Sequence, residues 1–444
     1  MPQPADGPEA IPQRERGMKL LCLSNGHGED AIAARVLTQL QAQAAAPAIA
    51  ALPIVGEGEA YRRAGISRIG PIQPMPSGGF IYMDQRQLWR DLRGGLIGLA
   101  LRQYRAVRRW AQGASARDPR AVLAVGDVVP LLLAWSSGLP YAFIGTAKSE
   151  YYLRDEAQWL PQTSRLERCV GSVYWPWERW LMRHRRCRGT FPRDALTAER
   201  LQQYGVPAFD LGNPMMDGLG AERAPAAQRR AALCVLLLPG SRAPEAYRNW
   251  QSLLQAAAAV ETTLADWPVQ FLAAIAPGLA DGPLHDCLRE QGWQAQSQPA
   301  VPAPIDDPED QLFASQHATL VLSRNAYSQC LHAADLALAT AGTATEQFVG
   351  LGKPAITIPG QGPQFTPAFA EAQSRLLGPS LQVAAGAREA AERVRSLLQD
   401  PDRLHLIAQN GRRRMGEPGA AARIAGCLQQ RLLASWRPTK KRSA

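Results

Sequence analysis

The chain has 444 residues, of which 46% are hydrophobic and 20% are charged, and this composition excludes a wholly disordered protein. Lysine and arginine outnumber aspartate and glutamate by 49 to 39, so the net charge of +10 indicates an anionic partner such as a nucleotide, a phospholipid surface or a nucleic acid. The seven cysteines form neither a CxxC pair nor a cluster with histidine, which predicts reduced thiols in a cytosolic protein.

Short apolar runs alternate with helical patterns along the first half of the chain. Residues 1–17 contain four prolines and no apolar core, so we expect a flexible end there and not a secretory signal. The runs at residues 19–23, 121–125 and 141–144 are typical of buried strands, and an apolar helical face follows the first of them. Strands that alternate with helices predict a parallel sheet covered by helices.

The alternation restarts after a break at residues 212–214. Strand-like runs follow at residues 233–238, 269–275, 335–340 and 355–359. No run approaches the about 18 apolar residues that a membrane-spanning helix needs, so we expect a soluble, cytoplasmic protein. The pattern predicts two successive α/β halves: a flexible end at 1–17, an N-terminal domain at 18–212, a C-terminal domain at 213–420, and a last helix with a basic tail at 421–444.

The loop at residues 24–30 follows the first predicted strand. A Gly-x-Gly-x-x-Ala pattern that begins at Gly26 matches a dinucleotide-binding fingerprint, but Glu29 and Asp30 would lie in the first helical turn, where they suit the helix dipole and repel a pyrophosphate. The loop is either a tight turn with an acidic cap or the edge of a cleft at which His27 acts as an acid–base or hydroxyl-binding group. The sequence leaves both interpretations open.

Asp127 follows the predicted strand at residues 121–125, directly after Gly126. An aspartate in this position either caps the next helix or lies at the edge of a cleft, where partial burial raises the carboxyl pKa and makes the group a general base. Both interpretations stay open here as well.

Two loops of the second half, at residues 239–242 and 342–346, combine small residues with groups that bind phosphate. In the first loop Gly240 permits close approach of the backbone, and Arg242 can form bidentate hydrogen bonds to phosphate oxygens. The second loop enters a helix, whose free N–H groups suit a diphosphate, and Glu346 can accept hydrogen bonds from ribose hydroxyls. We expect an anion site here, with two ordinary capped turns as the alternative. Its candidate residues are Gly240, Ser241, Arg242, Glu245, Gly342, Thr343, Ala344, Thr345 and Glu346.

The sequence contains no P-loop, no GxSxG nucleophile elbow and no HExxH zinc helix. We therefore expect no ATP hydrolysis of the P-loop type, no metal and no cofactor.

Two stretches rich in tryptophan and arginine lie at residues 79–110 and 174–188. Tryptophan with arginine beside an apolar face is typical of contact with a membrane surface. A solvated helix face explains the arginines but not three tryptophans within six positions, and nucleic acid is disfavoured because the basic residues lie beside apolar runs. The candidates for this surface, which would also receive the acceptor, are Trp89, Arg90, Arg93, Trp175, Trp177 and Trp180.

The order of these motifs resembles that of the inverting GT-B glycosyltransferases, in particular lipid-A-disaccharide synthase and its related branch in cyanobacteria. The resemblance covers most of residues 18–430. It is carried by the acidic loop at 24–30, the Gly-x-Asp that ends at Asp127, the segment from Gly212 to Asp217, the Leu-Pro-Gly-Ser-Arg loop that ends at Arg242, and the segment that ends at Glu346. Gln364 is similar to a glutamine in a loop of the peptidoglycan N-acetylglucosaminyltransferase.

The resemblance implies an α/β protein of GT-B fold, with two Rossmann-like parallel-sheet domains facing a central cleft. Such an enzyme moves a sugar, here of the GlcNAc type, from a UDP-sugar to a membrane lipid, on the inner face of the cytoplasmic membrane. Asp127 is then the catalytic base, with His27 and Glu29 as the other candidates. The loops at 240–242 and 342–345 hold the diphosphate, Glu346 holds the ribose, and Gln364 lies near the donor.

Three other classes of function stay open. A UDP-sugar epimerase of the same fold would not need the two tryptophan-rich stretches. A dinucleotide oxidoreductase would use the loop at Gly26 and bind a nicotinamide or flavin cofactor. A non-catalytic protein would bind lipid or nucleotide without turnover.

Overall fold

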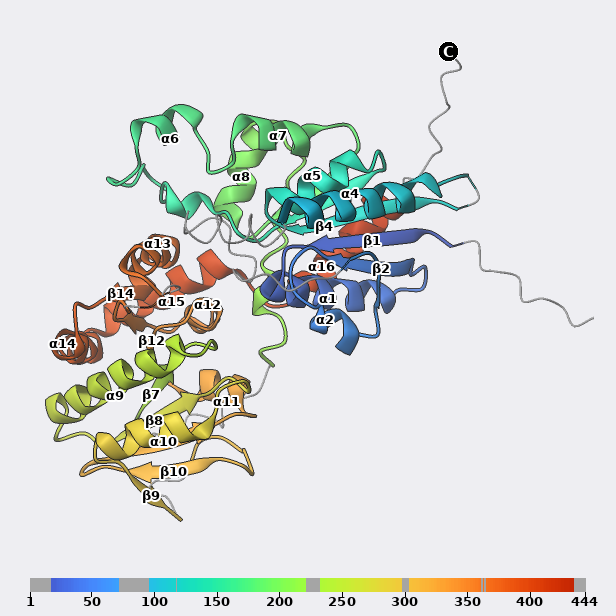
Figure 1. The fold of residues 1–444 in the computed structure, drawn as a ribbon. Coiled ribbons are helices and arrows are strands. Elements are labelled where there is room, and N and C mark those ends of the chain that lie inside the picture. Colours follow the sequence, from blue (N-terminus) through green and yellow to red (C-terminus); the bar gives the residue numbers. More distant parts are fainter. Residues whose placement is uncertain are drawn as a thin grey trace, which may run out of the picture.

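We describe a computed structural model of the chain for residues 17–71, 96–116, 118–220, 232–297, 303–360, 362 and 365–434. Within these residues the strands form two sheets, each with its own helices, and we call the resulting units the first and the second lobe. Figure 1 shows the first lobe in blue to green and the second in yellow to orange.

The first lobe contains a six-stranded sheet of order β3-β2-β1-β4-β5-β6 within the described residues, and every neighbouring pair is parallel. This is the strand order of a Rossmann sheet. The strands are β1 (Lys19–Ser24), β2 (Ala48–Pro53), β3 (Ser67–Arg68), β4 (Arg120–Gly126), β5 (Tyr141–Gly145) and β6 (Cys187–Pro192). The helices are α1 (His27–Gln41), α2 (Glu59–Arg63), α4 (Leu96–Gln112), α5 (Val128–Ser136), α6 (Arg165–Val170), α7 (Pro176–Arg183) and α8 (Ala195–Gln203).

Helices cover both faces of this sheet because its strands are apolar on both sides. Leu20 and Cys22 of β1 pack with α1 on one face, whereas Leu21 and Leu23 pack with α4, α5, α7 and α8 on the other. Successive side chains of a strand point to opposite faces, so a continuous apolar run can build two cores.

The second lobe contains an eight-stranded sheet of order β14-β13-β12-β7-β8-β11-β10-β9 within the described residues. Its strands are β7 (Leu233–Leu238), β8 (Val269–Ala274), β9 (Gln294–Gln296), β10 (Gln311–Ala314), β11 (Ala318–Ser323), β12 (Leu336–Ala339), β13 (Ala355–Thr357) and β14 (Leu381–Val383). Its helices are α9 (Glu245–Thr263), α10 (Asp281–Glu290), α11 (Tyr327–Ala333), α12 (Thr343–Gly350), α13 (Pro367–Leu377), α14 (Ala387–Leu398) and α15 (Pro401–Met415).

The sheet of this lobe is parallel, as predicted, except at one edge. β10 pairs antiparallel with both β11 and β9. Only residues 315–317 connect β10 to β11, and so short a connection allows a hairpin but not a parallel crossover. The other neighbouring pairs of the sheet are parallel.

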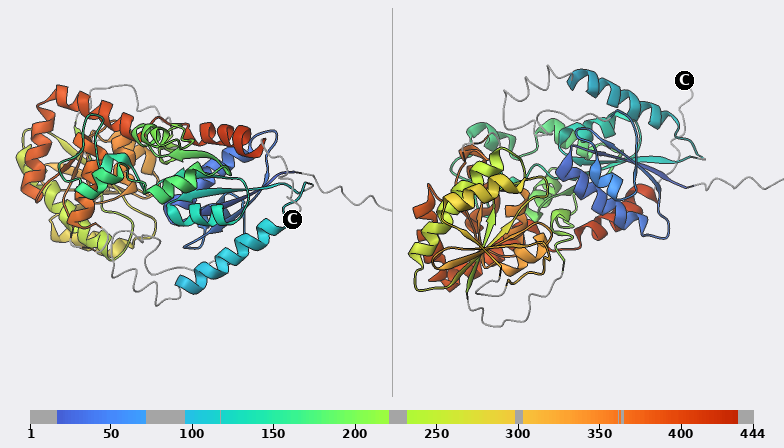
Figure 2. Two further views of the ribbon diagram at one scale, coloured as in Figure 1. Left: turned by 90° about the horizontal axis from the view of Figure 1, so that it is seen from above. Right: turned by 60° about the horizontal axis from the view of Figure 1, so that its bottom comes forward.

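The last helix, α16 (Ala420–Leu428), returns to the first lobe. Its side chains Ile424 and Leu428 are buried in the core that α1 forms with β1, and a π-helical turn at Gln429–Leu433 continues it. In Figure 1 and in both views of Figure 2, α16 (red) lies beside α1. We propose residues 18–212 and 213–420 as the two domains, with the chain from 421 onward crossing back.

Candidate active site

The loops at the carboxyl ends of the parallel strands carry the candidate residues of both lobes. Open parallel sheets bind ligands at this edge, because helix amino ends present free N–H groups there. In the first lobe these loops follow β1, β4, β5 and β6. In the second lobe they follow β7 and β12.

Asp127 and Glu29 are two carboxylates of the first lobe, one after β4 and one after β1. Asp127 is buried and caps α5, since its Oδ1 accepts a hydrogen bond of 2.8 Å from the N–H of Val129. Glu29 lies in the first turn of α1, and the Thr146 hydroxyl donates to its Oε1 over 3.4 Å. Burial raises the pKa of both carboxyls, and the charge of Asp127 raises the pKa of Glu29 further. The capping role of Asp127 is thus present, and its raised pKa also suits a general base.

A buried chain of hydrogen bonds fixes the loop that carries Glu29. Tyr61 donates to the Ser24 hydroxyl over 2.5 Å, and Ser24 donates to Oδ1 of Asp30 over 2.5 Å. The sequence predicted Asp30 in the first turn of α1 but gave no indication of this chain, because Tyr61 is distant along the sequence. Burial raises the pKa of Asp30 to about 7. The side chain of His27, the first residue of α1, lies outside the description.

The loop after β7 holds the first group of predicted anion-binding residues. Gly240 has φ +94°, a conformation that glycine adopts without strain. Ser241 is exposed and Arg242 half-buried. Burial lowers the pKa of Arg242 although the charge of Glu245 opposes the shift. Glu245 itself is buried, and its Oε1 accepts a hydrogen bond of 2.6 Å from the N–H of Phe365, so this carboxylate holds a neighbouring loop in place.

The second predicted group forms the amino end of α12. Gly342 precedes the helix, and no described side chain caps it. The Thr345 hydroxyl donates to the carbonyl of Ala341 over 2.6 Å, so its proton is used inside the fold, whereas Thr343 is exposed and Ala344 is half-buried. The first-turn N–H groups and the Thr343 hydroxyl are therefore the groups that this end offers to an anion.

Arg193 joins the two groups of loops, and the sequence analysis missed it. It directly follows β6, and its Nη2 donates to Oε2 of Glu346 on α12 over 2.7 Å. Its Nη1 donates to the carbonyl of Thr146 over 3.1 Å. This ion pair brings the carboxyl edge of the first sheet to the amino end of α12. A basic residue immediately after a strand was the signal that could have identified it.

The tryptophan-rich surface is described only in part. Trp175, Trp177 and Trp180 are 43%, 50% and 54% exposed at the start of α7 and along it. Trp180 stacks edge-to-face on Trp135 of α5, with 5.6 Å between ring centroids. Trp89, Arg90, Arg93 and the donor-loop candidate Gln364 lie outside the described residues.

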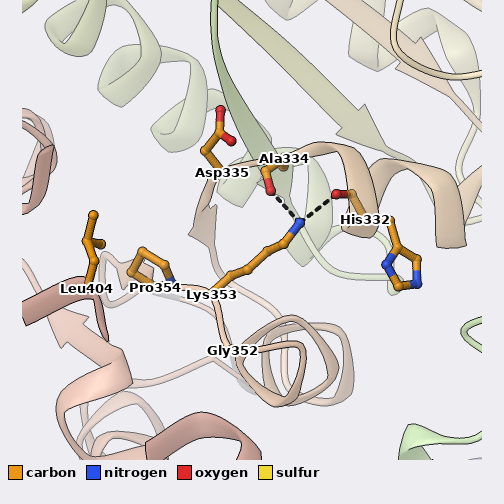
Figure 3. Close-up of a pocket in the computed structure, with 7 residues that line it drawn as sticks. All are labelled: His332, Ala334, Asp335, Gly352, Lys353, Pro354 and Leu404. Carbon is orange, nitrogen blue, oxygen red and sulfur yellow. Dashed lines mark hydrogen bonds between the residues drawn. The ribbon is translucent and has the colours of Figure 1, made fainter. Parts of the chain in front are cut away.

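A hollow of about 440 Å³ lies at the opposite edge of the second sheet. Figure 3 shows it at the amino ends of β12 and β13, between Asp335 and Pro354. Lys353 extends across it, and its Nζ donates to the carbonyls of Leu331, His332 and Ala334 at the end of α11. The ammonium group thus satisfies helix carbonyls, which accounts for this residue without a ligand.

In the described part of the chain, no three His, Cys, Asp or Glu side chains gather as metal ligands. None of the helices described is both long and apolar enough to cross a membrane.

The chain matches no protein-family model and no curated protein, but it is similar to many solved structures. The calicheamicin glycosyltransferase CalG4 has a TM-score of 0.57 at 16% identity, covering 96% of this chain and 100% of its own. The UDP-GlcNAc 2-epimerase from Neisseria meningitidis bound to UDP-GlcNAc has a TM-score of 0.52 at 13% identity, covering 93% of this chain and 100% of its own. MurG from Acinetobacter baumannii has a TM-score of 0.52 at 14% identity, covering 93% of this chain and 99% of its own. At these identities the likeness concerns the fold alone, and the resemblance to lipid-A-disaccharide synthase stays a prediction. The chain has the GT-B fold, with two Rossmann-like domains.

Proposed function

We propose that this protein is an inverting glycosyltransferase that moves a sugar of the GlcNAc type from a UDP-sugar to a lipid hydroxyl at a membrane surface. The observation that carries the proposal is the meeting of two complementary edges. The first lobe supplies two carboxylates, the half-buried Glu29 and the buried Asp127, and the second supplies the uncapped end of α12 with Arg242 nearby in the loop after β7. Proteins of the same fold whose names specify UDP-GlcNAc support the choice of donor.

The arrangement suits a single displacement. Asp127 takes the proton of the acceptor hydroxyl, whose oxygen attacks the anomeric carbon of the sugar while the bond from that carbon to the UDP oxygen breaks. A raised carboxyl pKa makes Asp127 a stronger base. The N–H groups at the start of α12 and the Arg242 guanidinium stabilise the charge on the departing UDP. One displacement inverts the anomeric configuration, and no metal is required in this scheme.

The exposed tryptophans of α7 favour an acceptor that lies in a membrane surface. Indole rings partition into the region of the lipid headgroups, and basic residues beside them are attracted to anionic lipids. Arg183 and Arg185 follow Trp177 and Trp180 closely along the chain. We place the protein at the inner face of the cytoplasmic membrane for this reason.

A UDP-GlcNAc 2-epimerase is the second candidate, because two carboxylates in one site can serve as base and acid on the same sugar. The pair Glu29 and Asp127 meets this requirement, and several proteins of this fold carry the epimerase name. An epimerase would act without lipid.

The product of the purified full chain distinguishes the two candidates. The protein is incubated with UDP-[14C]GlcNAc, with and without bacterial lipid extract, and the label is followed into the organic phase and into the aqueous sugar-nucleotide pool. The transferase predicts lipid-linked label that requires the extract, and the epimerase predicts a new sugar nucleotide in its absence. Asp127→Asn keeps a good helix cap and should lower transfer at least about a hundredfold. Asp118→Asn is the matched control, since among the described residues the Asp118 carboxylate pairs with Lys19 and Arg120, before β4. Full transfer by Asp127→Asn contradicts the assignment of the base.

A further inference from the structure

The ion pair between Arg193 and Glu346 is a buried contact between the two lobes. Their exposed fractions are only 6% and 9%. The guanidinium is held from the first lobe by the carbonyl of Thr146 and from the second by the carboxylate of Glu346. Its Nε is buried and has no hydrogen-bond partner among the described residues. Arg193 therefore retains a buried Nε–H donor that no group of the described residues accepts.

The carboxylate that Arg193 hydrogen-bonds is Glu346, although the charge of Asp194 also acts on the guanidinium. Its neighbour Asp194 is buried, but Oδ1 of that carboxylate accepts from both the N–H and the hydroxyl of Thr197, at 2.8 and 2.7 Å, and thereby caps α8. Glu346 lies in the first turn of α12, where the helix dipole favours its negative charge. The ion pair connects the two lobes at the point where the donor is proposed to bind.

A buried ion pair adds little stability compared with apolar residues of the same size, but removal of one partner leaves an uncompensated buried charge. A ligand that replaces the Arg193 guanidinium at the Glu346 carboxylate must therefore offer Arg193 another negative charge. A nucleoside diphosphate meets both conditions, because its ribose hydroxyls donate to a carboxylate and its phosphates accept from a guanidinium. The open amino end of α12, one turn before Glu346, is where the phosphates would lie.

We propose that Arg193 and Glu346 form a latch between the lobes that the donor nucleotide opens. The inference rests on the proposed function and deepens it. In the free protein the pair holds the lobes together. When a nucleoside diphosphate binds, its ribose hydroxyls replace the guanidinium at Glu346, and Arg193 turns to the diphosphate, where its Nε and Nη2 both find acceptors. Arg193 is thus a donor-binding residue that the first lobe contributes to a site of the second.

The first arm of the test uses the ligand-free full chain. The variants Arg193→Gln, Glu346→Gln and the double variant form a cycle, measured by hydrogen exchange at the start of α12 and by urea unfolding. A latch predicts that each single change increases exchange and that the double change adds little to either. Arg375→Gln is the control, since Arg375 also reaches the other lobe, through the carbonyl of Tyr152, and its effect should add to that of Arg193→Gln. Simple additivity of Arg193→Gln and Glu346→Gln overturns the latch.

The second arm measures the affinities for uridine and UDP by calorimetry. Arg193→Gln should bind uridine more tightly than the wild type, because Glu346 is no longer occupied. Its preference for UDP over uridine should fall by at least about tenfold, the loss expected for one charge-assisted hydrogen bond. Arg193→Lys, which keeps the charge, should show an intermediate preference. An unchanged uridine affinity overturns the competition for Glu346, and an unchanged preference overturns the transfer of Arg193 to the diphosphate.

The two arms separate this inference from the proposed function. Coupling in the free protein without any binding of UDP would overturn the donor assignment, and with it the opening of the latch by nucleotide. Selective UDP binding without coupling would overturn the latch alone.

Discussion

Replacement of Asp30 by asparagine should change how the stability of the protein depends on pH. Asp30 is only 1% exposed, and Oδ1 accepts the hydrogen bond of Ser24. Its Oδ2 is buried without a hydrogen-bond partner among the described residues. An amide retains the acceptor oxygen and the shape of the side chain but cannot lose a proton. The substitution therefore removes the titration and leaves the packing.

The sign and size of the effect follow from the pKa of this carboxyl. Burial raises it from 3.8 to about 7 in the folded protein, so between these values the folded chain holds a proton that the unfolded chain has released. The free energy of unfolding then decreases as pH rises from about 4 to about 7, and it changes no further at higher pH. At 1.36 kcal/mol per pH unit, the group lowers stability by up to about 4 kcal/mol at neutral pH.

Urea unfolding of the wild type and of Asp30→Asn at pH values from 4 to 8 measures this contribution. Glu29 and Asp127 also have raised pKa values and act in the same direction, so the quantity to compare is the difference between the two proteins at each pH. Asp30→Asn should gain stability relative to the wild type as pH rises, by up to about 4 kcal/mol over this range.

Asp118→Asn supplies a control of opposite sign. Arg120 and Lys19 lower the pKa of Asp118, so its contribution is present above the ordinary pKa and is lost as pH falls. This variant should therefore lose stability relative to the wild type as pH rises through values below the ordinary pKa of 3.8, and its profile should stay parallel to that of the wild type from pH 4 to 8. Parallel pH profiles for the wild type and Asp30→Asn would refute the reasoning about the buried carboxyl.

Two further variants test the last helix and the tryptophan-rich surface. The carboxylate of Asp217 accepts three hydrogen bonds of 2.5 to 3.1 Å from N–H groups at the start of α16. Asp217→Ala should therefore lower the free energy of unfolding, measured with urea, by about 1–3 kcal/mol. A loss of stability no greater than that of the control Asp210→Ala contradicts this role. The double variant Trp177→Ser/Trp180→Ser should bind anionic vesicles at least about tenfold more weakly in a sedimentation assay, since each apolar side chain that leaves water contributes about 1.5–3 kcal/mol. Trp267→Ser, which changes a ring that is 52% exposed on the second lobe, is its control, and equal losses in the two proteins would exclude a specific surface on α7.

The alternation of apolar runs was sufficient to predict two α/β lobes. β7 has the predicted limits Leu233–Leu238, and α12 follows the loop at Gly342 as expected. The predicted strand at residues 335–340 is shorter by one residue at each end, although the N–H groups of Asp335 and Thr340 still donate to the carbonyls of Cys234 and Leu238 in β7. Short strands such as β3 (Ser67–Arg68), whose two residues are both exposed, carry no apolar run and were not predicted.

The sequence could predict the parts of the candidate site that depend on local patterns, but not the parts that depend on contacts between distant segments. Position after a strand is a local property, and it identified Asp127, Gly240 and the start of α12. The pairing of Arg193 with Glu346 depends on how two lobes pack, and no local pattern encodes it. Asp217 was noted only as part of a motif, and its role appears once α16, more than two hundred residues later in the sequence, returns to meet it.

The most direct test of the account is whether the protein selects uridine nucleotides. Thermal unfolding of the full chain is followed with UDP, UDP-GlcNAc, GDP, ADP and NAD, each at the same concentration. A ligand at 100 times its dissociation constant stabilises the folded state by about 2.7 kcal/mol, which a melting curve resolves readily. We predict a rise in the melting temperature with UDP and UDP-GlcNAc and little change with the others. A rise with NAD alone, or with none of the five, would contradict the proposed donor site.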